Sequence, residues 1–142
     1  GKFFSRDENR MFSLVTKQST LYIPRMEWTV LFDPNFRTWF YQQPERFQDK
    51  AFAMFHVLEQ EGPALGRPHV DTLQGTNLPH LKELRIQFQG QPWRILFAFD
   101  PHRQALLLLG GNKTGQKRWY KENIPIAEER YQQHLQQFEK DS

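Results

Sequence analysis

The chain contains no cysteine. Disulfides, thiolate metal sites and a cysteine nucleophile are therefore excluded together. Long apolar runs are missing too: none approaches the roughly 20 residues of a membrane-spanning helix, so the sequence predicts a soluble protein, which we place in the cytoplasm. At 142 residues, with 13 Phe and 4 Trp, the chain is long enough for one domain with a compact, phenylalanine-rich core.

Several catalytic constellations are missing as well. Ser5, Ser13 and Ser19 lie in the N-terminal tail, so no Ser-His-Asp triad can be built around them. The five histidines show no metal-ligand spacing with a third ligand nearby, so neither a metal nor another cofactor is expected. Glu83 stands alone on its predicted strand, which excludes the paired carboxylates of a glycosidase. The segment GGNKTGQKRW lacks the phosphate-loop pattern, which excludes a nucleoside-triphosphate site.

Acidic residues are scarce in one part of the chain. Residues 64–121 hold nine Lys or Arg and three acids, whereas residues 26–63 and 122–142 each carry a net charge of −3. This segregation creates a local positive field that can steer a polyanion. Residues 1–25 are predicted to be an N-terminal extension, flexible or partly foreign to the natural protein, and residues 26–142 to form the domain.

The pattern of apolar residues and turn residues predicts the order β-α-α-β-β-β-α, and hence an α+β domain. Asp33 followed by Pro34 is typical of a helix start, and Pro44 opens a second helix that ends at Gly62-Pro63. The predicted elements are strand 27–32, these two helices, a long loop over 63–80, antiparallel strands 82–88, 93–100 and 105–110, and a helix over 125–139. The helices have one apolar side each, so we expect them to cover a single face of the sheet.

The other face is predicted to carry positive charge. Strand alternation places Glu83 and Arg85 on the less apolar side of one strand, and Arg94 on that side of the next. The flanking cations are Lys82, Lys113, Lys117 and Arg118, with His80, Trp119 and Tyr120 nearby. Cations interleaved with aromatic rings are typical of a surface that binds a phosphate backbone and a stacked base. Gly110, Gly111 and Gly115 are expected to let the backbone turn and approach a ligand.

Five segments carry a family resemblance: LKELRIQF, PWRILFAFD, LLLLGGNKTGQKRWY, LGRPHVDTLQG and IPIAEERY. From residue 26 to about 138 the chain resembles the RelE/HigB toxin superfamily, specifically its phage-derived HigB-like branch. The resemblance implies a small twisted antiparallel sheet with two N-terminal helices and one C-terminal helix. It also implies a toxin of a type II toxin–antitoxin system, a ribosome-associated endoribonuclease that cleaves mRNA and is held inactive by a cognate antitoxin, commonly of the helix-turn-helix type.

The resemblance also suggests roles for individual residues. Arg94 matches the phosphate-stabilising strand arginine, Lys82 and Arg85 match basic positions of the preceding strand, and Lys113 falls near a further cationic site. Trp119 and Tyr120 could supply the base-stacking ring, while Lys117, Arg118 and His80 would contact RNA. The reaction would need no metal, because RNA supplies its own 2′-OH nucleophile. Arg94 and Arg85 would hold the phosphate, Lys82 or Glu83 would act on the 2′-OH, and Lys113 would lie near the leaving oxygen.

Two other functions stay open at this point. A ParE-like protein with this fold would poison DNA gyrase without catalysis, since fold alone does not decide function. A catalytically silent module that binds a protein partner would use the exposed aromatic residues as an interface.

Overall fold

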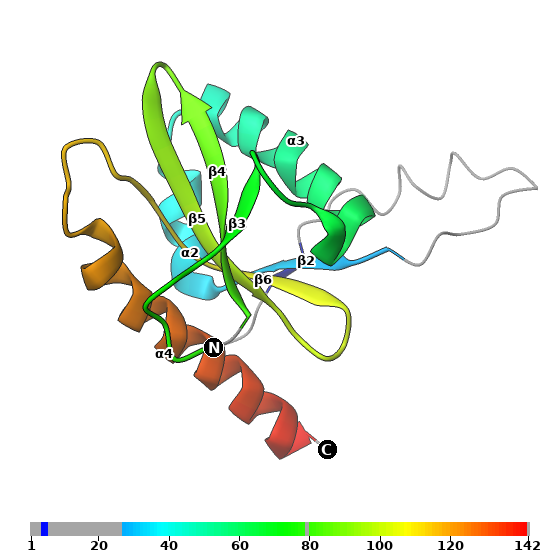
Figure 1. Ribbon diagram of the computed structural model, residues 1–142. Helices are drawn as coiled ribbons and strands as arrows, with labels where there is room; N and C mark the ends of the chain where they lie inside the picture. The colour runs from blue at the N-terminus through cyan, green and yellow to red at the C-terminus, as the bar shows by residue number, and fades with distance from the viewer. Residues whose placement is uncertain (1–3, 6–26, 79, 142) are drawn as a thin grey trace, which may run out of the picture.

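The computed structural model describes residues 4–5, 27–78 and 80–141, without the side chains of residues 4–5 and 138–141. Along this part of the chain lie β1 (Phe4–Ser5), β2 (Thr29–Phe32), α2 (Pro34–Tyr41), α3 (Glu45–Glu61), the short 3-10 helix η1 (Gly62–Ala64), β3 (Val70–Thr72), β4 (Leu81–Phe88), β5 (Gln91–Phe99), β6 (Gln104–Asn112) and α4 (Trp119–Asp141). The described strands form one sheet in the order β1-β2-β6-β5-β4-β3 (Figure 1). The predicted α+β class is confirmed.

The sheet is mixed, not purely antiparallel. Strands β4, β5 and β6 form the predicted antiparallel meander through two short turns. Strand β2, however, runs parallel to β6, with Val30 opposite Ala105. In the chain, α2, α3 and three further strands lie between β2 and β6. A connection of this length is long enough for the two strands to pair in parallel.

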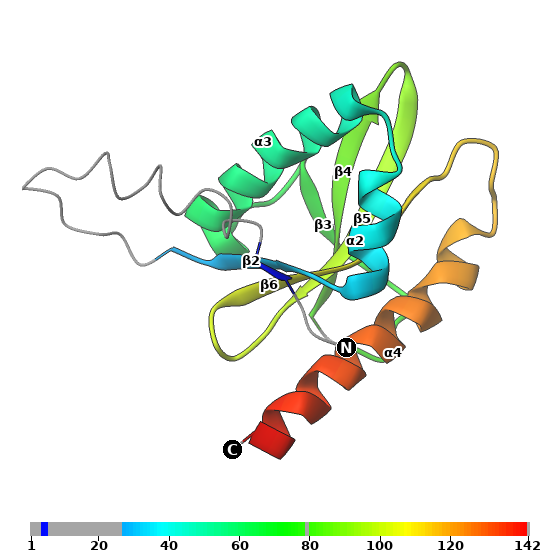
Figure 2. The ribbon, with the colours of Figure 1, turned by 180° about the vertical axis from the view of Figure 1, so that it is seen from behind.

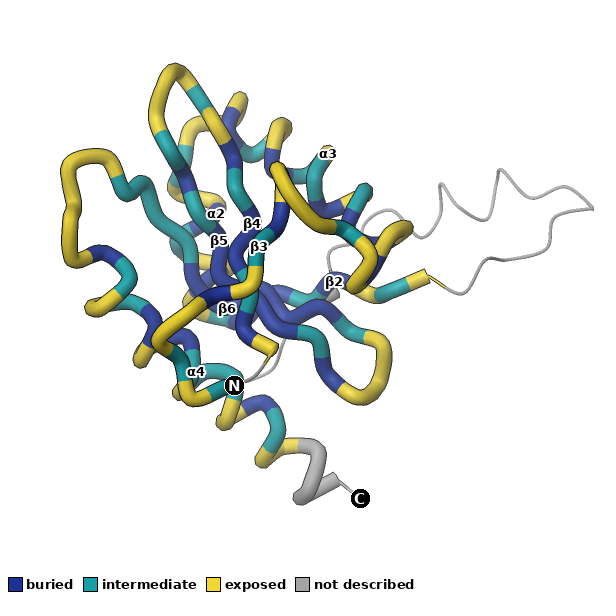
Figure 3. Tube along the Cα trace, in the orientation of Figure 1, coloured by how far each residue is buried: buried dark blue, intermediate teal, exposed yellow. Residues whose placement is uncertain are grey.

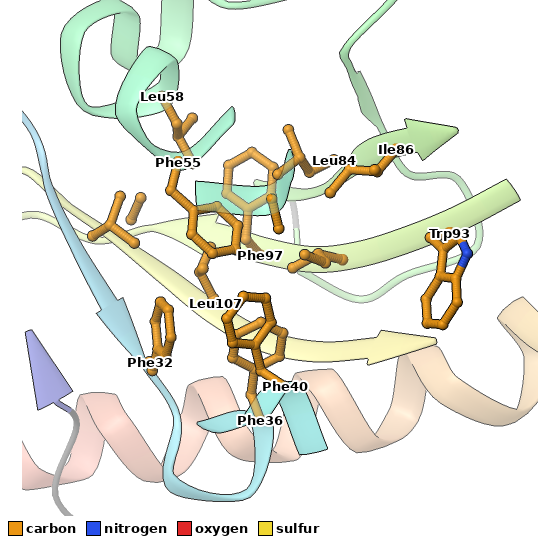
Figure 4. Close-up of a cluster of buried hydrophobic side chains, with 14 of the residues drawn as sticks. Phe32, Phe36, Phe40, Phe55, Leu58, Leu84, Ile86, Trp93, Phe97 and Leu107 are labelled. Atoms are coloured by element: carbon orange, nitrogen blue, oxygen red, sulfur yellow. The ribbon is translucent and has the colours of Figure 1, made fainter. Parts of the chain in front are cut away.

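One face of the sheet is covered by α2 and α3 (Figure 2). Helix α2 begins as predicted, since the Asp33 carboxylate accepts hydrogen bonds from the backbone N–H groups of Asn35 and Phe36 at 2.8 and 2.9 Å. Its buried phenylalanines pack with those of α3 and with Phe32 of β2 in edge-to-face and tilted pairs (Figure 4). Such pairs add about 0.5–1.5 kcal/mol each beyond the area that they bury. The phenylalanine-rich core is confirmed.

The opposite face is covered in part by α4, which corrects the expectation that all helices lie on one side. Leu96, Leu106 and Leu108 point to this face and pack with Trp119, Ile124 and Ala127 of α4. Helix α4 begins at Trp119, six residues before the predicted start at Pro125, which lies exposed inside the helix. The buried Trp119 ring fixes the first turn, and this tertiary contact outweighs the proline signal.

Two short strands fall where none was predicted. The loop predicted over 63–80 contains β3, which pairs with β4 through Val70 opposite Leu84. Strand β1 pairs with β2 and lies inside the predicted N-terminal extension. The rest of that extension, residues 1–3 and 6–25, lies outside the described residues. In Figure 3 the centre of the sheet is buried, while the turns and the loop between β6 and α4 are exposed.

Candidate functional site

Two arginines lie directly opposite each other on neighbouring strands. The register of β4 and β5 pairs Arg85 with Arg94 on the face that α4 partly covers. Like charges in this arrangement destabilise a sheet. The Arg94 side chain is only 12% exposed and that of Arg85 is 35% exposed, so water screens them incompletely. The opposed pair therefore needs a counter-charge.

The counter-charge is Glu83, two residues before Arg85 on the same face of β4. Its Oε1 lies 3.3 Å from Arg94 Nε, and its Oε2 lies 3.3 Å from Arg85 Nη2. The residue is buried. One carboxylate thus holds two guanidinium groups side by side, and the face is less positive than the sequence suggested. An incoming phosphate would compete with Glu83 for the same two cations.

Helix α4 and the loop before it complete the cluster. The Tyr120 O–H donates a hydrogen bond of 2.5 Å to Glu83 Oε1. Burial, and next the hydrogen bond to the Glu83 carboxylate, raise the pKa of Tyr120 above its ordinary value, although Arg94 acts in the opposite direction. Lys113 Nζ lies 5.2 Å from the centre of the Tyr120 ring, a cation–π distance. These contacts define what we call the Glu83 cluster: Glu83, Arg85, Arg94, Lys113 and Tyr120.

Strand β3 adds a second carboxylate at the edge of this cluster. Asp71 Oδ2 lies 3.6 Å from Arg85 Nη2 and 2.7 Å from Arg67 Nη2. The hydrogen bond from the Arg67 guanidinium holds the pKa of Asp71 below its ordinary value. Arg85 is therefore shared between two acids, whereas Arg94 faces one of them.

Lys82 and His80 do not join the cluster. Lys82 lies opposite Phe97, whose ring packs in the core beneath α3, so this lysine has its place on the other face from Arg85. It lines a separate hollow together with His80, beside the buried Asp100. The strand alternation already implied this separation, because positions 82 and 85 have opposite parity.

Trp119 cannot stack on a base in this structure, because it is buried against the sheet. The glycines of β6 are needed for packing, which the sequence did not suggest. A Cβ on Gly110 would lie 2.3 Å from the Trp39 ring, and one on Gly111 would lie 2.8 Å from Trp119 Nε1. These glycines make room for two indole rings instead of a ligand. Gly115, with φ +68°, does form the expected turn.

Lys117 and Arg118 are exposed in the loop before α4 and line a shallow hollow of about 460 Å³. They lie beside the first turn of α4, next to Tyr120 in the sequence. His134, which the sequence placed inside a helix, is buried with its Nε2 3.2 Å from Asp100 Oδ2. Among the described residues, no group of three or more His, Cys, Asp or Glu side chains could hold a metal ion.

Sequence reasoning missed how the polar groups are joined. Asp71 was placed in a loop, and Tyr120 was assigned to base stacking only, without its bond to Glu83. The contact between Asp71 and Arg85 had a weak signal in the sequence, since the short run VDT before the strand over 82–88 is compatible with a β-strand. The contact between Tyr120 and Glu83 had none, because the two residues are 37 positions apart.

Comparison with known proteins places this chain in a family. The fold is that of a small RelE-like α+β protein, and the Glu83 cluster lies on its sheet. The chain matches the family described as phage-derived protein Gp49-like (DUF891) over residues 38–132, and it belongs to that family and, with its HigB relatives, to the RelE/HigB toxin superfamily.

Two relatives come from Mycobacterium tuberculosis (strain ATCC 25618 / H37Rv). The chain is 54% identical to the proposed toxin HigB2 over 90 residues, which are 62% of this chain and 45% of HigB2, so it spans less than half of that protein. It is 47% identical to the proposed toxin HigB3 over 102 residues, 71% of this chain and 88% of HigB3. A free-state mutant of the E. coli toxin RelE superposes with a TM-score of 0.52 at 11% identity, over 74% of this chain and 98% of RelE, a likeness of fold alone.

Among the described residues, no helix is long and apolar enough to cross a membrane.

Proposed function

We propose that this protein is the toxin of a type II toxin–antitoxin system and acts as a metal-independent endoribonuclease on mRNA at the ribosome, in the cytoplasm. The observation that carries the proposal is the pair of opposed guanidinium groups, Arg85 and Arg94, held by one buried carboxylate beside a phenol. The names of the HigB relatives support the toxin assignment. From the family resemblance, the proposal includes a cognate antitoxin of the helix-turn-helix type that holds the toxin inactive.

The first step is binding of the scissile phosphate. Arg94 and Arg85 turn from Glu83 toward the phosphate oxygens and stabilise the extra negative charge that develops as the 2′-oxygen attacks phosphorus. A fixed donor of this kind contributes about 10²–10³ in rate. Arg94 is the stronger candidate, because its side chain is the more buried and its position the more fixed.

The proton transfers use the rest of the cluster. The 2′-OH passes its proton to the Tyr120 oxygen while Tyr120 passes its own to Glu83, with which it already shares a 2.5 Å hydrogen bond. The O2′–P bond forms and the P–O5′ bond breaks. Lys113 gives a proton to the leaving O5′, so the products are a 2′,3′-cyclic phosphate and a 5′-hydroxyl end. Of the two bases that the sequence suggested, we assign the proton transfer to Glu83, because Lys82 lies on the other face of the sheet. Lys117 and Arg118, on the exposed loop, bind the RNA backbone.

The test is expression of the chain with mapping of mRNA 5′ ends, with and without an inhibitor of translation. We expect growth arrest and new 5′ ends only during translation, and at least a hundredfold fewer cuts with Arg94→Ala. Arg46→Ala, an exposed arginine of α3, is the matched control and should cut normally. Arrested cells with intact mRNA would reject the proposal, and gyrase-linked DNA breaks in those cells would favour the ParE-like alternative.

A further inference from the structure

A hollow of about 420 Å³ opens beside the Glu83 cluster, at the edge of β4. Strand β3 pairs with β4 only over Lys82–Leu84, so within the described part of the chain the remainder of this edge has no neighbouring strand. Arg85 and Arg94 both line the hollow. The hollow is therefore continuous with the proposed phosphate site, although no step of the reaction uses it.

The backbone explains why the edge stays open here. The Arg85 N–H donates to the His69 carbonyl at 2.8 Å, which ends the contact with the β3 segment. Since amide groups alternate in direction along a strand, the N–H and C=O of Gln87 point to the same edge. The Gln87 carbonyl accepts a hydrogen bond from Lys50 Nζ of α3. Lys50 and Met54 lie one turn apart on α3 and face the hollow together.

The walls of the hollow combine apolar surface with positive charge, beside His69 and Gln87. Met54, Pro68 and Ile86 supply apolar surface, and Lys50 joins the two arginines as a third cation. No carboxylate is among the described residues that line it. A nucleotide combines a flat apolar ring with an anionic phosphate and so matches both kinds of wall. An acidic peptide would match the cations but offers no flat ring to the apolar wall.

We propose that this hollow holds the base of a nucleotide next to the scissile phosphate and so sets part of the cleavage-sequence preference. The inference rests on the proposed function, because the phosphate held by Arg85 and Arg94 is what brings the base to the hollow. Met54 is then a specificity-determining residue on α3, a helix that contributes nothing to the Glu83 cluster itself.

The first experiment fills the hollow and sequences the cuts. Met54→Trp places an indole in the hollow, whereas Ala53→Trp adds the same ring at an exposed position one residue earlier and is the control. With Met54→Trp, the base preference at one position beside the cut should weaken by about tenfold or more, because a filled hollow no longer selects bases by their size. Ala53→Trp should leave the preference unchanged. An unaltered preference in a folded Met54→Trp protein overturns the base site and leaves the proposed function standing.

The second experiment needs neither cleavage nor a variant. The chain has three methionines, so the methyl signal of Met54 can be followed by NMR after labelling with methyl-¹³C methionine. The probes are a fully 2′-O-methylated RNA, which cannot be cut, the same strand without bases, and an oligoglutamate of equal charge. We expect the Met54 signal to shift with the first probe and not with the other two. An equal shift with the baseless strand or the oligoglutamate would identify a general anion or acidic-peptide site and overturn the inference. A base-dependent shift in a protein that cuts no RNA would support the base site while rejecting the endoribonuclease proposal.

Discussion

Replacement of Glu83 by glutamine removes the negative charge that lies between Arg85 and Arg94. In the native protein the two carboxylate oxygens lie 3.3 Å from one guanidinium nitrogen each. Breaking a buried ion pair from one side costs about 3–5 kcal/mol, because the partner charge stays buried without compensation. Arg85 is 35% exposed, so water screens part of this loss. We therefore expect Glu83→Gln to lower the free energy of unfolding by about 2–4 kcal/mol.

Urea denaturation followed by tryptophan fluorescence measures this loss, with Glu129→Gln as the control. Glu129 is an exposed acid of α4, and its substitution should change the stability by less than about 0.5 kcal/mol. Inorganic phosphate provides a second arm. It should stabilise Glu83→Gln more than the native protein, since in the native protein it must displace a carboxylate. Saturation at about 100 times its Kd would restore roughly 2.7 kcal/mol.

Two results would refute this reasoning. A Glu83→Gln protein as stable as the Glu129→Gln control would mean that the two arginines do not depend on the carboxylate. Equal stabilisation of native and variant protein by phosphate would mean that the anion binds somewhere other than the guanidinium pair.

Further predictions concern β6 and the first turn of α4. Gly111→Ala should lower stability by about 1–3 kcal/mol, because the new Cβ would lie 2.8 Å from Trp119 Nε1. Gly66→Ala, with nothing within 4 Å of its Cβ, is the control, and equal melting temperatures for the two variants would contradict the packing argument. The raised pKa of Tyr120 predicts a pH dependence. The unfolded phenol ionises near pH 10.0 and the folded one only at higher pH. The stability that Tyr120 contributes to the folded protein is therefore fully present below pH 10.0 and is lost as the pH rises through the folded pKa. Urea midpoints between pH 8 and 11 should therefore fall more steeply for the native protein than for Tyr120→Phe; parallel curves would show that the phenol is not perturbed.

Local signals predicted most of the elements in this fold. Asp33 followed by Pro34 marked the start of α2, and the short connections between the strands predicted over 82–88, 93–100 and 105–110 marked the antiparallel meander. The signals failed where pairing is non-local. Neither the parallel register of β2 on β6 nor the short β3 can be obtained from turn chemistry, since each depends on a strand far away in the chain. Helix α4 begins before Pro125 because a tertiary contact of Trp119 fixes its first turn.

The candidate site divides in the same way. Strand alternation was sufficient to place Glu83, Arg85 and Arg94 on one face, because side-chain direction along a strand is a local property with a period of two residues. The same rule separates Lys82 from them. What each side chain contacts on that face is a property of packing, and the sequence offered no measure of it.

The sequence by itself determined that the chain has no thiol chemistry, that its core is rich in phenylalanine and that residues 64–121 hold an excess of cations. Only the tertiary structure decided that one buried carboxylate holds two of these cations together, that Tyr120 is bonded to that carboxylate and that Trp119 belongs to the core. The physical reason is range. Composition and alternation act over a few residues, whereas a contact between positions 37 apart exists only after α4 has packed on the sheet.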